Sequence, residues 1–276
     1  SPVVRPAGQG YVIVSGFNRI EAIVLNRENT FFARVLPQET PESRCHVMAI
    51  TALAFQRPLT HAELIRAVRR LSRFYPMDTL AQKSGIIFNT RLNAGFLQTL
   101  LSISHLPDAA LDLIHNGLLS IKAAQRILGL KTHEIQPVLT LFSQMKASVS
   151  KQLEIITFLT EISRRDNIAL TEILSQQQIQ VVLADQDLPP GVKTNLVRTI
   201  LYQIRFPSIA TAQQEMKKQI AALKLGPGIS VVVPENFESP GKSVSFDFKS
   251  PEEFEARLQT LKTAAQTPAF NALFHL

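Results

Sequence analysis

Residues 106–130 read LPDAALDLIHNGLLSIKAAQRILGL, and this stretch decides the fold that the sequence predicts. Pro107 suits the first turn of a helix, where its missing N–H costs nothing, and the apolar residues after it recur at helical spacing. Asn116-Gly117 supplies left-handed residues that end this helix, and Ser120 is placed to cap a second apolar helix. The pattern therefore predicts two packed helices. By itself it is equally typical of any all-helical core.

The composition is that of a folded protein, with 45% hydrophobic and 18% charged residues in a chain of 276. No apolar run reaches the ~18 residues needed to span a bilayer. The one cysteine, Cys45, leaves no internal disulfide and no cysteine-rich zinc site. We therefore expect a soluble, cytoplasmic protein that does not enter the membrane. The chain opens without Met in a strand-like run, which predicts that it begins inside a longer protein.

The formal net charge is +7, and most of this excess falls in one third of the chain. Eleven Lys and Arg residues stand against five acidic residues between Arg57 and Lys146. Such a cluster predicts contact with a polyanion such as DNA. A solvated basic face without a partner is the alternative.

Residues before this basic region predict a small β-β-α-β unit. Its elements are two strands that form a hairpin, a helix and a third strand, at residues 3–5, 11–15, 17–26 and 30–36. A helix over 42–56 follows. Gly16 lies where strand passes into helix, a place that favours an anion because free N–H groups and the helix dipole meet there.

The basic region itself predicts a helix-turn-helix. A basic amphipathic helix over 59–74 starts with a capping box of Thr60 and Glu63. A short helix over 77–84 ends at Gly85, and a helix over 89–104 follows, which is the arrangement that places the second helix in the major groove. The residues expected to contact DNA are Lys83, Asn89, Thr90, Arg91, Asn93, Lys122 and Arg126.

Further helices are expected over 132–174, split near 146–150, and then over 192–205 and 209–223 after a linker at 185–191. Two strands, 229–233 and 243–248, and a last helix close the chain as a β-β-α module. This helix is expected to start with Pro251 in its first turn and a capping box of Ser250 and Glu253. The sequence thus predicts a mainly α protein with small α+β units. We expect three regions: 1–57, a partial nucleotide-binding unit; 58–184, a helical DNA-binding domain; and 185–276, an interaction module.

The stretch 106–130 resembles the segment after the helix-turn-helix in the ParB family of bacterial DNA-partitioning proteins, approximately L-P-x-x-x-x-x-L-x-x-G-x-L-S-x-x-x-A-x-x-L-L-G-L. The residues that match this pattern are Leu106, Pro107, Leu113, Gly117, Leu119, Ser120, Leu128, Gly129 and Leu130, with one residue more between Leu113 and Gly117 than the pattern has. In the helix-turn-helix before it, Leu80, Ala81 and Gly85 also match the family. The resemblance covers about Val3 to Leu130 and implies a partial, N-terminally truncated ParB/sulfiredoxin-like unit followed by a helix-turn-helix.

Two shorter motifs extend the resemblance to a nucleotide site. Gly16, Arg19 and Ala22 fit the family's phosphate-binding box G-E-R-R-x-R-A, and the same residues with Glu21 fit the form G-x-H-R-x-E-A of ParB-like nucleases. Phe17 and Asn18 replace the family's Glu and its Arg or His.

The second motif, E-N-x-Q-R, is matched by Gln56 and Arg57, whereas Leu53 and Ala54 stand where Glu and Asn would help to hold a magnesium-bound nucleotide. Neither side chain can ligate a hard cation. The resemblance therefore implies a degenerate CTP pocket that binds weakly and without magnesium. Its expected nucleotide-binding residues are Gly16, Asn18, Arg19, Gln56 and Arg57.

No catalytic or metal-ligating residue is expected. The six histidines lack metal-binding spacing, and neither a G-x-S-x-G elbow nor a full Walker loop occurs. The resemblance implies a nucleoid-associated protein that binds double-stranded DNA in chromosome or plasmid partition or in transcription regulation, and a clamp of the family's kind would require a homodimer. The alternative is a ParB-like nuclease or nucleotide hydrolase.

Overall fold

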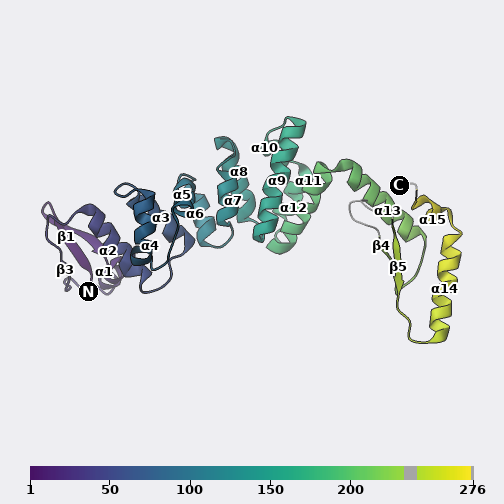
Figure 1. Cartoon of the computed structure of the whole chain (residues 1–276), viewed down its shortest axis with the longest axis horizontal. Coiled ribbons are helices and arrows are strands. Elements are labelled where there is room, and N and C mark those ends of the chain that lie inside the picture. Colours follow the sequence, from purple (N-terminus) through teal and green to yellow (C-terminus); the bar gives the residue numbers. More distant parts are fainter. Residues whose placement is uncertain (233–240, 275–276) are drawn as a thin grey trace. The chain divides into compact units, whose positions relative to one another are not determined.

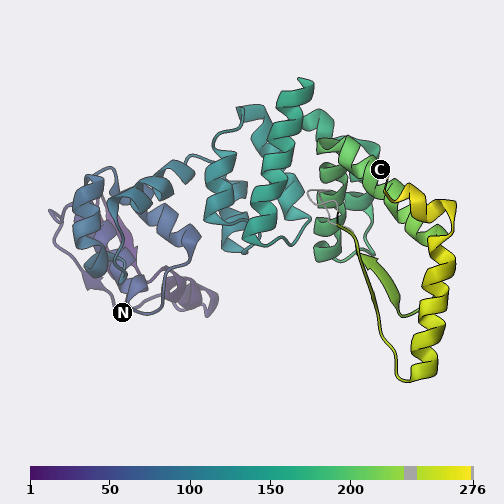
Figure 2. The ribbon, with the colours of Figure 1, turned by 45° about the vertical axis from the view of Figure 1, so that its right-hand side comes forward.

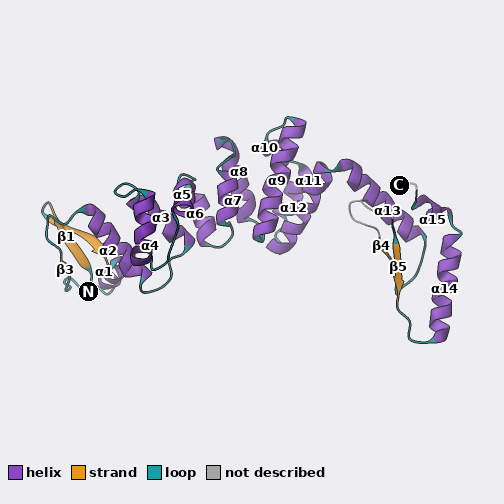
Figure 3. Ribbon diagram, viewed as in Figure 1, coloured by secondary structure: helices purple, strands orange, loops and turns teal. Residues whose placement is uncertain are grey.

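The computed structural model describes residues 1–232 and 241–274, and over these residues the chain is mainly helical, as predicted (Figures 1 and 3). Fifteen helices and five strands lie in those ranges. They form two compact units, Ser1–Leu196 and Val197–Leu276, and the boundary falls within helix α12 (Pro190–Arg205). The expected division at 57/58 lies inside the first unit, and that at 184/185 lies shortly before its end.

A three-stranded sheet of order β2-β1-β3 opens the first unit, made of β1 (Val3–Ala7), β2 (Gly10–Ser15) and β3 (Arg34–Val35). The first two strands form the predicted antiparallel hairpin. β3 is parallel to β1 and much shorter than the strand predicted over 30–36. Its partner β1 begins at Val3, and Pro37 has no N–H to continue the ladder.

Helices α1 (Phe17–Leu25) and α2 (Glu42–Ala54) follow the sheet strands as predicted, and α2 packs on β2. The predicted capping box then starts α3 (His61–Leu71). Thr60 Oγ1 accepts the Glu63 N–H at 3.3 Å, and the Glu63 carboxylate accepts the Thr60 N–H at 2.8 Å. The apolar face of α3 packs on α5 (Ala94–Ile103) and so joins the sheet region to the helices behind it.

The bounds predicted for the helix-turn-helix were wrong at α4 (Met77–Ile87), which continues through Gly85. The extra turn is favourable because the side chains of Ile87 and Phe88 are buried. Asn89 then adopts a left-handed conformation with φ 53° and turns the chain away.

The following helix, α5, begins five residues later than the predicted Asn89, because Asn93 is its N-cap. The Asn93 Oδ1 accepts the Phe96 N–H at 2.7 Å. Ser84 Oγ accepts the Leu92 N–H at 2.9 Å and pins the connection against α4. Residues 88–93 therefore form a longer connection than the tight turn of a helix-turn-helix.

The two helices predicted from 106–130 are confirmed as α6 (Asp108–His115) and α7 (Ile121–Ile127). Gly117 has φ 70°, and Ser120 Oγ accepts the Ala123 N–H at 3.2 Å. Most of the apolar residues at helical spacing in this stretch line the core: Leu106, Ala110, Leu113, Ile114, Ala124 and Ile127 are buried, whereas Ile121 and Leu128 are half-buried.

The rest of the first unit is helical: α8 (Thr132–Ser143), α9 (Val149–Asp166), α10 (Leu170–Leu174), α11 (Gln177–Ala184) and the start of α12. Three helices, not two, occupy 132–174, because Asn167 takes φ 53° and ends α9. The predicted linker over 185–191 is shorter, since Pro190 already begins α12.

Two buried polar side chains tie these helices together. Gln152 on α9 donates to the carbonyl oxygens of Leu118 and Ala147 and accepts the Ser120 N–H. The buried Glu134 accepts the N–H groups of Lys131 and Leu170, at the starts of α8 and α10.

The second unit contains the predicted β-β-α order and one more helix: α13 (Pro207–Ala222), β4 (Ile229–Val232), β5 (Ser243–Phe246), α14 (Pro251–Ala265) and α15 (Pro268–Ala272). Figure 2 shows α15 folded back beside α13. Ser250 caps α14 as expected. The other half of the expected capping box does not form, because the Glu253 carboxylate accepts the Lys249 N–H and not the Ser250 N–H. Val233, expected in the first strand, lies outside the described residues, and β5 ends before Phe248.

Candidate functional site

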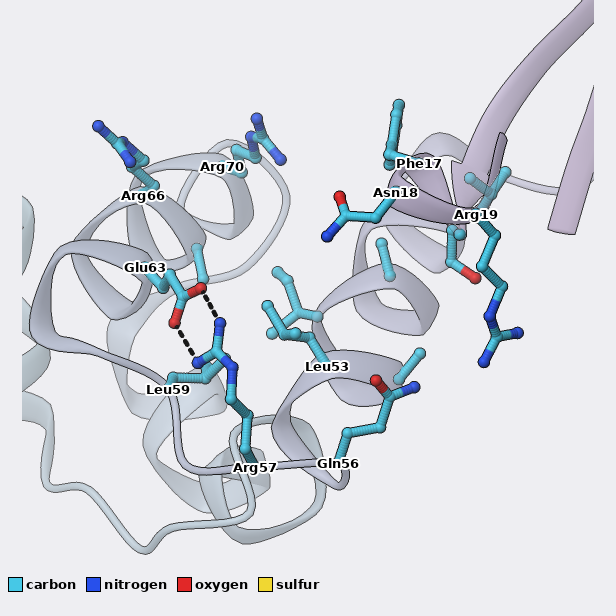
Figure 4. A pocket seen from close by; sticks show the side chains of 17 residues that line it. Phe17, Asn18, Arg19, Leu53, Gln56, Arg57, Leu59, Glu63, Arg66 and Arg70 are labelled. Carbon is cyan, nitrogen blue, oxygen red and sulfur yellow. Dashed lines mark hydrogen bonds and ion pairs between the residues drawn. The ribbon is translucent and has the colours of Figure 1, made fainter. Parts of the chain in front are cut away.

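A pocket of about 430 Å³ opens between α1, α2 and α3 in the first unit. Its wall comes from three stretches of chain, 14–19, 49–57 and 59–70. All the expected nucleotide-binding residues line it, namely Gly16, Asn18, Arg19, Gln56 and Arg57 (Figure 4). The structure thus brings together two motifs that are far apart in sequence.

The start of α1 forms one wall of this pocket. Gly16 precedes the helix with φ 90°, and a Cβ there would lie 2.9 Å from Pro2 Cα, so the backbone itself requires glycine. In the part of the chain that the structure describes, no side chain caps α1. Its first N–H groups are therefore open to an anion, and the Asn18 side chain extends into the pocket beside them (Figure 4).

Arg57 lines the pocket, but its guanidinium is bound to Glu63. Arg57 Nη1 donates to Glu63 Oε2 at 2.8 Å, and Nη2 donates to Oε1 at 2.5 Å. These hydrogen bonds lower the pKa of Glu63 from its ordinary 4.5 to about 2, with the capping-box bonds to Thr60 adding to the effect. The pair is neutral overall. It also connects the residue after α2 to the first turn of α3.

Two further cations on the pocket wall come from α3. Arg66 and Arg70 lie one helical turn apart and extend from the same side of the helix, across the opening from Phe17 and Asn18 (Figure 4). Arg66 Nη2 lies 3.6 Å from Asp112 Oδ1, with both side chains about half exposed or more. No ion pair to Arg70 or Arg19 forms among residues 1–232 and 241–274.

These pocket residues were not all found from the sequence. The basic helix predicted over 59–74 did not place Arg66 or Arg70 at the pocket, and Glu63 was predicted only as part of a capping box. The shared face of Glu63, Arg66 and Arg70 was visible from their helical spacing. What covers that face was not.

The residues present do not fit a bound magnesium ion. Leu53 lines the wall with an apolar side chain and Ala54 is fully buried, so neither side chain offers an oxygen ligand. Both oxygens of Glu63, the one carboxylate of the wall, already accept hydrogen bonds from Arg57. Within the described ranges no three His, Cys, Asp or Glu side chains gather as metal ligands would. Hard cations need such oxygen donors.

The residues expected to read DNA lie mostly off the helix on which they were predicted. Asn89, Thr90 and Arg91 belong to the connection before α5, and Asn93 is its cap. The Asn89 side chain donates to the Ala54 carbonyl oxygen at 3.3 Å. Lys83 is on α4, with its Nζ 5.6 Å from the centre of the Tyr75 ring.

The two remaining residues that were expected to contact DNA lie on a helix. Lys122 and Arg126 are exposed and one turn apart on α7. The other nine basic residues of 57–146 are exposed as well. Among the five acidic residues of this region, Glu134 is buried, Glu63 is bound to Arg57, and Asp112 lies 3.6 Å from Arg66. Each pair cancels one positive and one negative charge, so the burial of Glu134 alone makes the exposed net charge slightly more positive than the sequence total.

The fold and pocket define a mainly helical protein with a small mixed sheet and an arginine-lined pocket. No protein-family model matches the chain, and no curated protein does either. None of the helices in the described ranges is both long and apolar enough to cross a membrane.

Proposed function

We propose that this is a ParB-like protein that binds double-stranded DNA through its basic helical region and carries a degenerate nucleotide pocket. The observation that carries the proposal is the convergence of Gly16, Asn18 and Arg19 with Gln56 and Arg57 on one pocket. The sequence resemblance implied that these residues act together, and no local pattern required them to meet.

DNA binding is supported by charge. The eleven basic side chains between Arg57 and Lys146 are exposed, and three of the five acids there are buried or paired. Guanidinium and ammonium groups on such a surface bind phosphates and release counterions. Through this surface the protein acts as a nucleoid-associated homodimer in partition or transcription regulation.

The enzyme alternative, a nuclease or nucleotide hydrolase, has less support. Such chemistry needs a general base or a metal-held water. The one carboxylate of the pocket is held by Arg57 and is a very weak base with a pKa of about 2. We therefore propose weak binding of CTP without magnesium and without turnover.

The test is a fluorescence-anisotropy titration of the whole chain with a duplex of about 20 base pairs at several salt concentrations. Each neutralised phosphate contributes about 0.9 to the slope of log K against log salt. We expect a slope of several. A flat response would exclude DNA binding through the basic region.

A further inference from the structure

We infer that Arg66 and Arg70 of α3, with the open N-terminus of α1, hold the phosphate chain of a triphosphate ligand, and that Arg57 serves to position α3. The inference rests on the proposed pocket function and names the residues and the charge chemistry of that site. The sequence motifs pointed instead to Arg57 as a phosphate ligand.

The charge of Arg57 is not free to bind an anion. Arg57 donates two hydrogen bonds to Glu63, so a phosphate approaching that guanidinium also meets a carboxylate that stays ionised. Repulsion between the two anions cancels much of the attraction. The Arg57 end of the pocket is therefore a poor place for a phosphate group.

The opposite rim of the pocket carries two arginines of α3. Arg66 and Arg70 line the pocket from one side of α3, and Asn18 faces them from the start of α1 (Figure 4). Among the residues that the structure describes, the one ion pair on this rim joins Arg66 to Asp112 at 3.6 Å. Both groups are exposed, so this pair is weak enough to give way to a phosphate. Two guanidiniums and open helix N–H groups suit an extended chain of phosphates.

Magnesium has no free carboxylate ligand in this pocket among the residues that the structure describes. A triphosphate normally needs a divalent cation to neutralise its charge, and the carboxylate on the wall, Glu63, is already bound to Arg57. Arg66 and Arg70 supply that positive charge from the protein. The preferred ligand is thus the metal-free triphosphate, whether it belongs to a nucleotide or is inorganic tripolyphosphate.

The experiment is isothermal titration calorimetry of the whole chain with CTP and with inorganic tripolyphosphate, each in EDTA and in magnesium. The variants are R66Q/R70Q, R57Q and, as matched control, R73Q, an exposed arginine just beyond α3 that does not line the pocket. Thermal unfolding of every variant is measured in parallel.

We expect R66Q/R70Q to weaken triphosphate binding at least about tenfold, since charge-assisted hydrogen bonds are lost, with an unchanged melting temperature. R73Q should change binding less than about twofold. R57Q should lower the melting temperature more than the double variant does. Magnesium should weaken binding to the wild-type chain. Tighter binding of CTP than of tripolyphosphate would assign the ligand to nucleotides, and equal binding would assign it to the phosphate chain alone.

Wild-type binding that R66Q/R70Q leaves intact and R57Q abolishes would overturn this inference while the proposed pocket function stands. Absence of any triphosphate binding to the wild-type chain would overturn both. A double variant that loses DNA binding but keeps triphosphate binding would assign these arginines to DNA and refute the inference.

Discussion

Arg57 and Glu63 form a two-pronged ion pair, at 2.8 and 2.5 Å, between the end of α2 and the first turn of α3. Glu63 is also the third residue of the α3 capping box, so one carboxylate satisfies the Thr60 N–H and a guanidinium together. This arrangement fixes the direction in which α3 leaves the pocket. It therefore sets where Arg66 and Arg70 stand.

The Arg57–Glu63 pair should make the free energy of unfolding depend on pH in the acid range. The pKa of Glu63 is lowered from 4.5 to about 2 in the folded chain. A group whose pKa is lower when folded stabilises the fold above its unfolded pKa, and this contribution is lost as the pH falls from about 4.5 towards 2. Because Arg57 is half exposed, solvent screening reduces this contribution of Glu63 to the free energy of unfolding to about 1–2 kcal/mol.

Urea unfolding of wild-type and E63Q chains from pH 7 to pH 2 measures this contribution. We expect E63Q to be less stable at pH 7 and the difference to close near pH 2. A difference that stays constant over this range would show that the charge of Glu63 is irrelevant.

Gln152→Leu should destabilise the first unit by about 3 kcal/mol, because it leaves the carbonyls of Leu118 and Ala147 and the Ser120 N–H without their buried partner. Gln136→Leu on the exposed face of α8 is the matched control and should change stability by less than about 0.5 kcal/mol. Denaturant unfolding of both variants provides the comparison. Equal effects would mean that the Gln152 bonds contribute nothing.

Gly16→Ala should cost more than Gly8→Ala, although both glycines have positive φ. At Gly8 nothing lies near the added Cβ, so only the backbone penalty of about 1–2 kcal/mol applies. At Gly16 the Cβ would lie 2.9 Å from Pro2 Cα, which adds about 1–3 kcal/mol. The melting temperatures of the two variants show which substitution costs more stability. The reverse order would be inconsistent with the close approach of Pro2.

Lys122→Gln with Arg126→Gln should weaken DNA binding uniformly across sequences and reduce the salt slope by about 2, one for each lost phosphate contact. Lys262→Gln, an exposed residue on α14, is the control. Anisotropy titrations of the wild-type chain and of both variants, on two duplexes of unrelated sequence at several salt concentrations, give the slopes. An unchanged slope in the double variant would remove α7 from the DNA-binding surface.

Local sequence patterns predicted much of the fold because the interactions behind them are local. The capping box of Thr60 and Glu63 closes within one turn, and Gly117 and Ser120 end and start helices by their own conformations and side chains. The resemblance to a known family added the pocket residues. Those five residues do line one pocket.

The sequence by itself thus determined where most helices begin, that the chain is mainly helical and which third of it is basic. Tertiary packing decided what local rules leave open. Helix α4 continues past Gly85 because the side chains of Ile87 and Phe88 are buried there. Arg57 was predicted as a nucleotide ligand, but in the folded chain its guanidinium is hydrogen-bonded to Glu63. Arg66 and Arg70 line the pocket because α3 packs beside the elements that carry the other lining residues. Hydrogen bonds and burial between distant segments depend on distances that the order of residues does not contain.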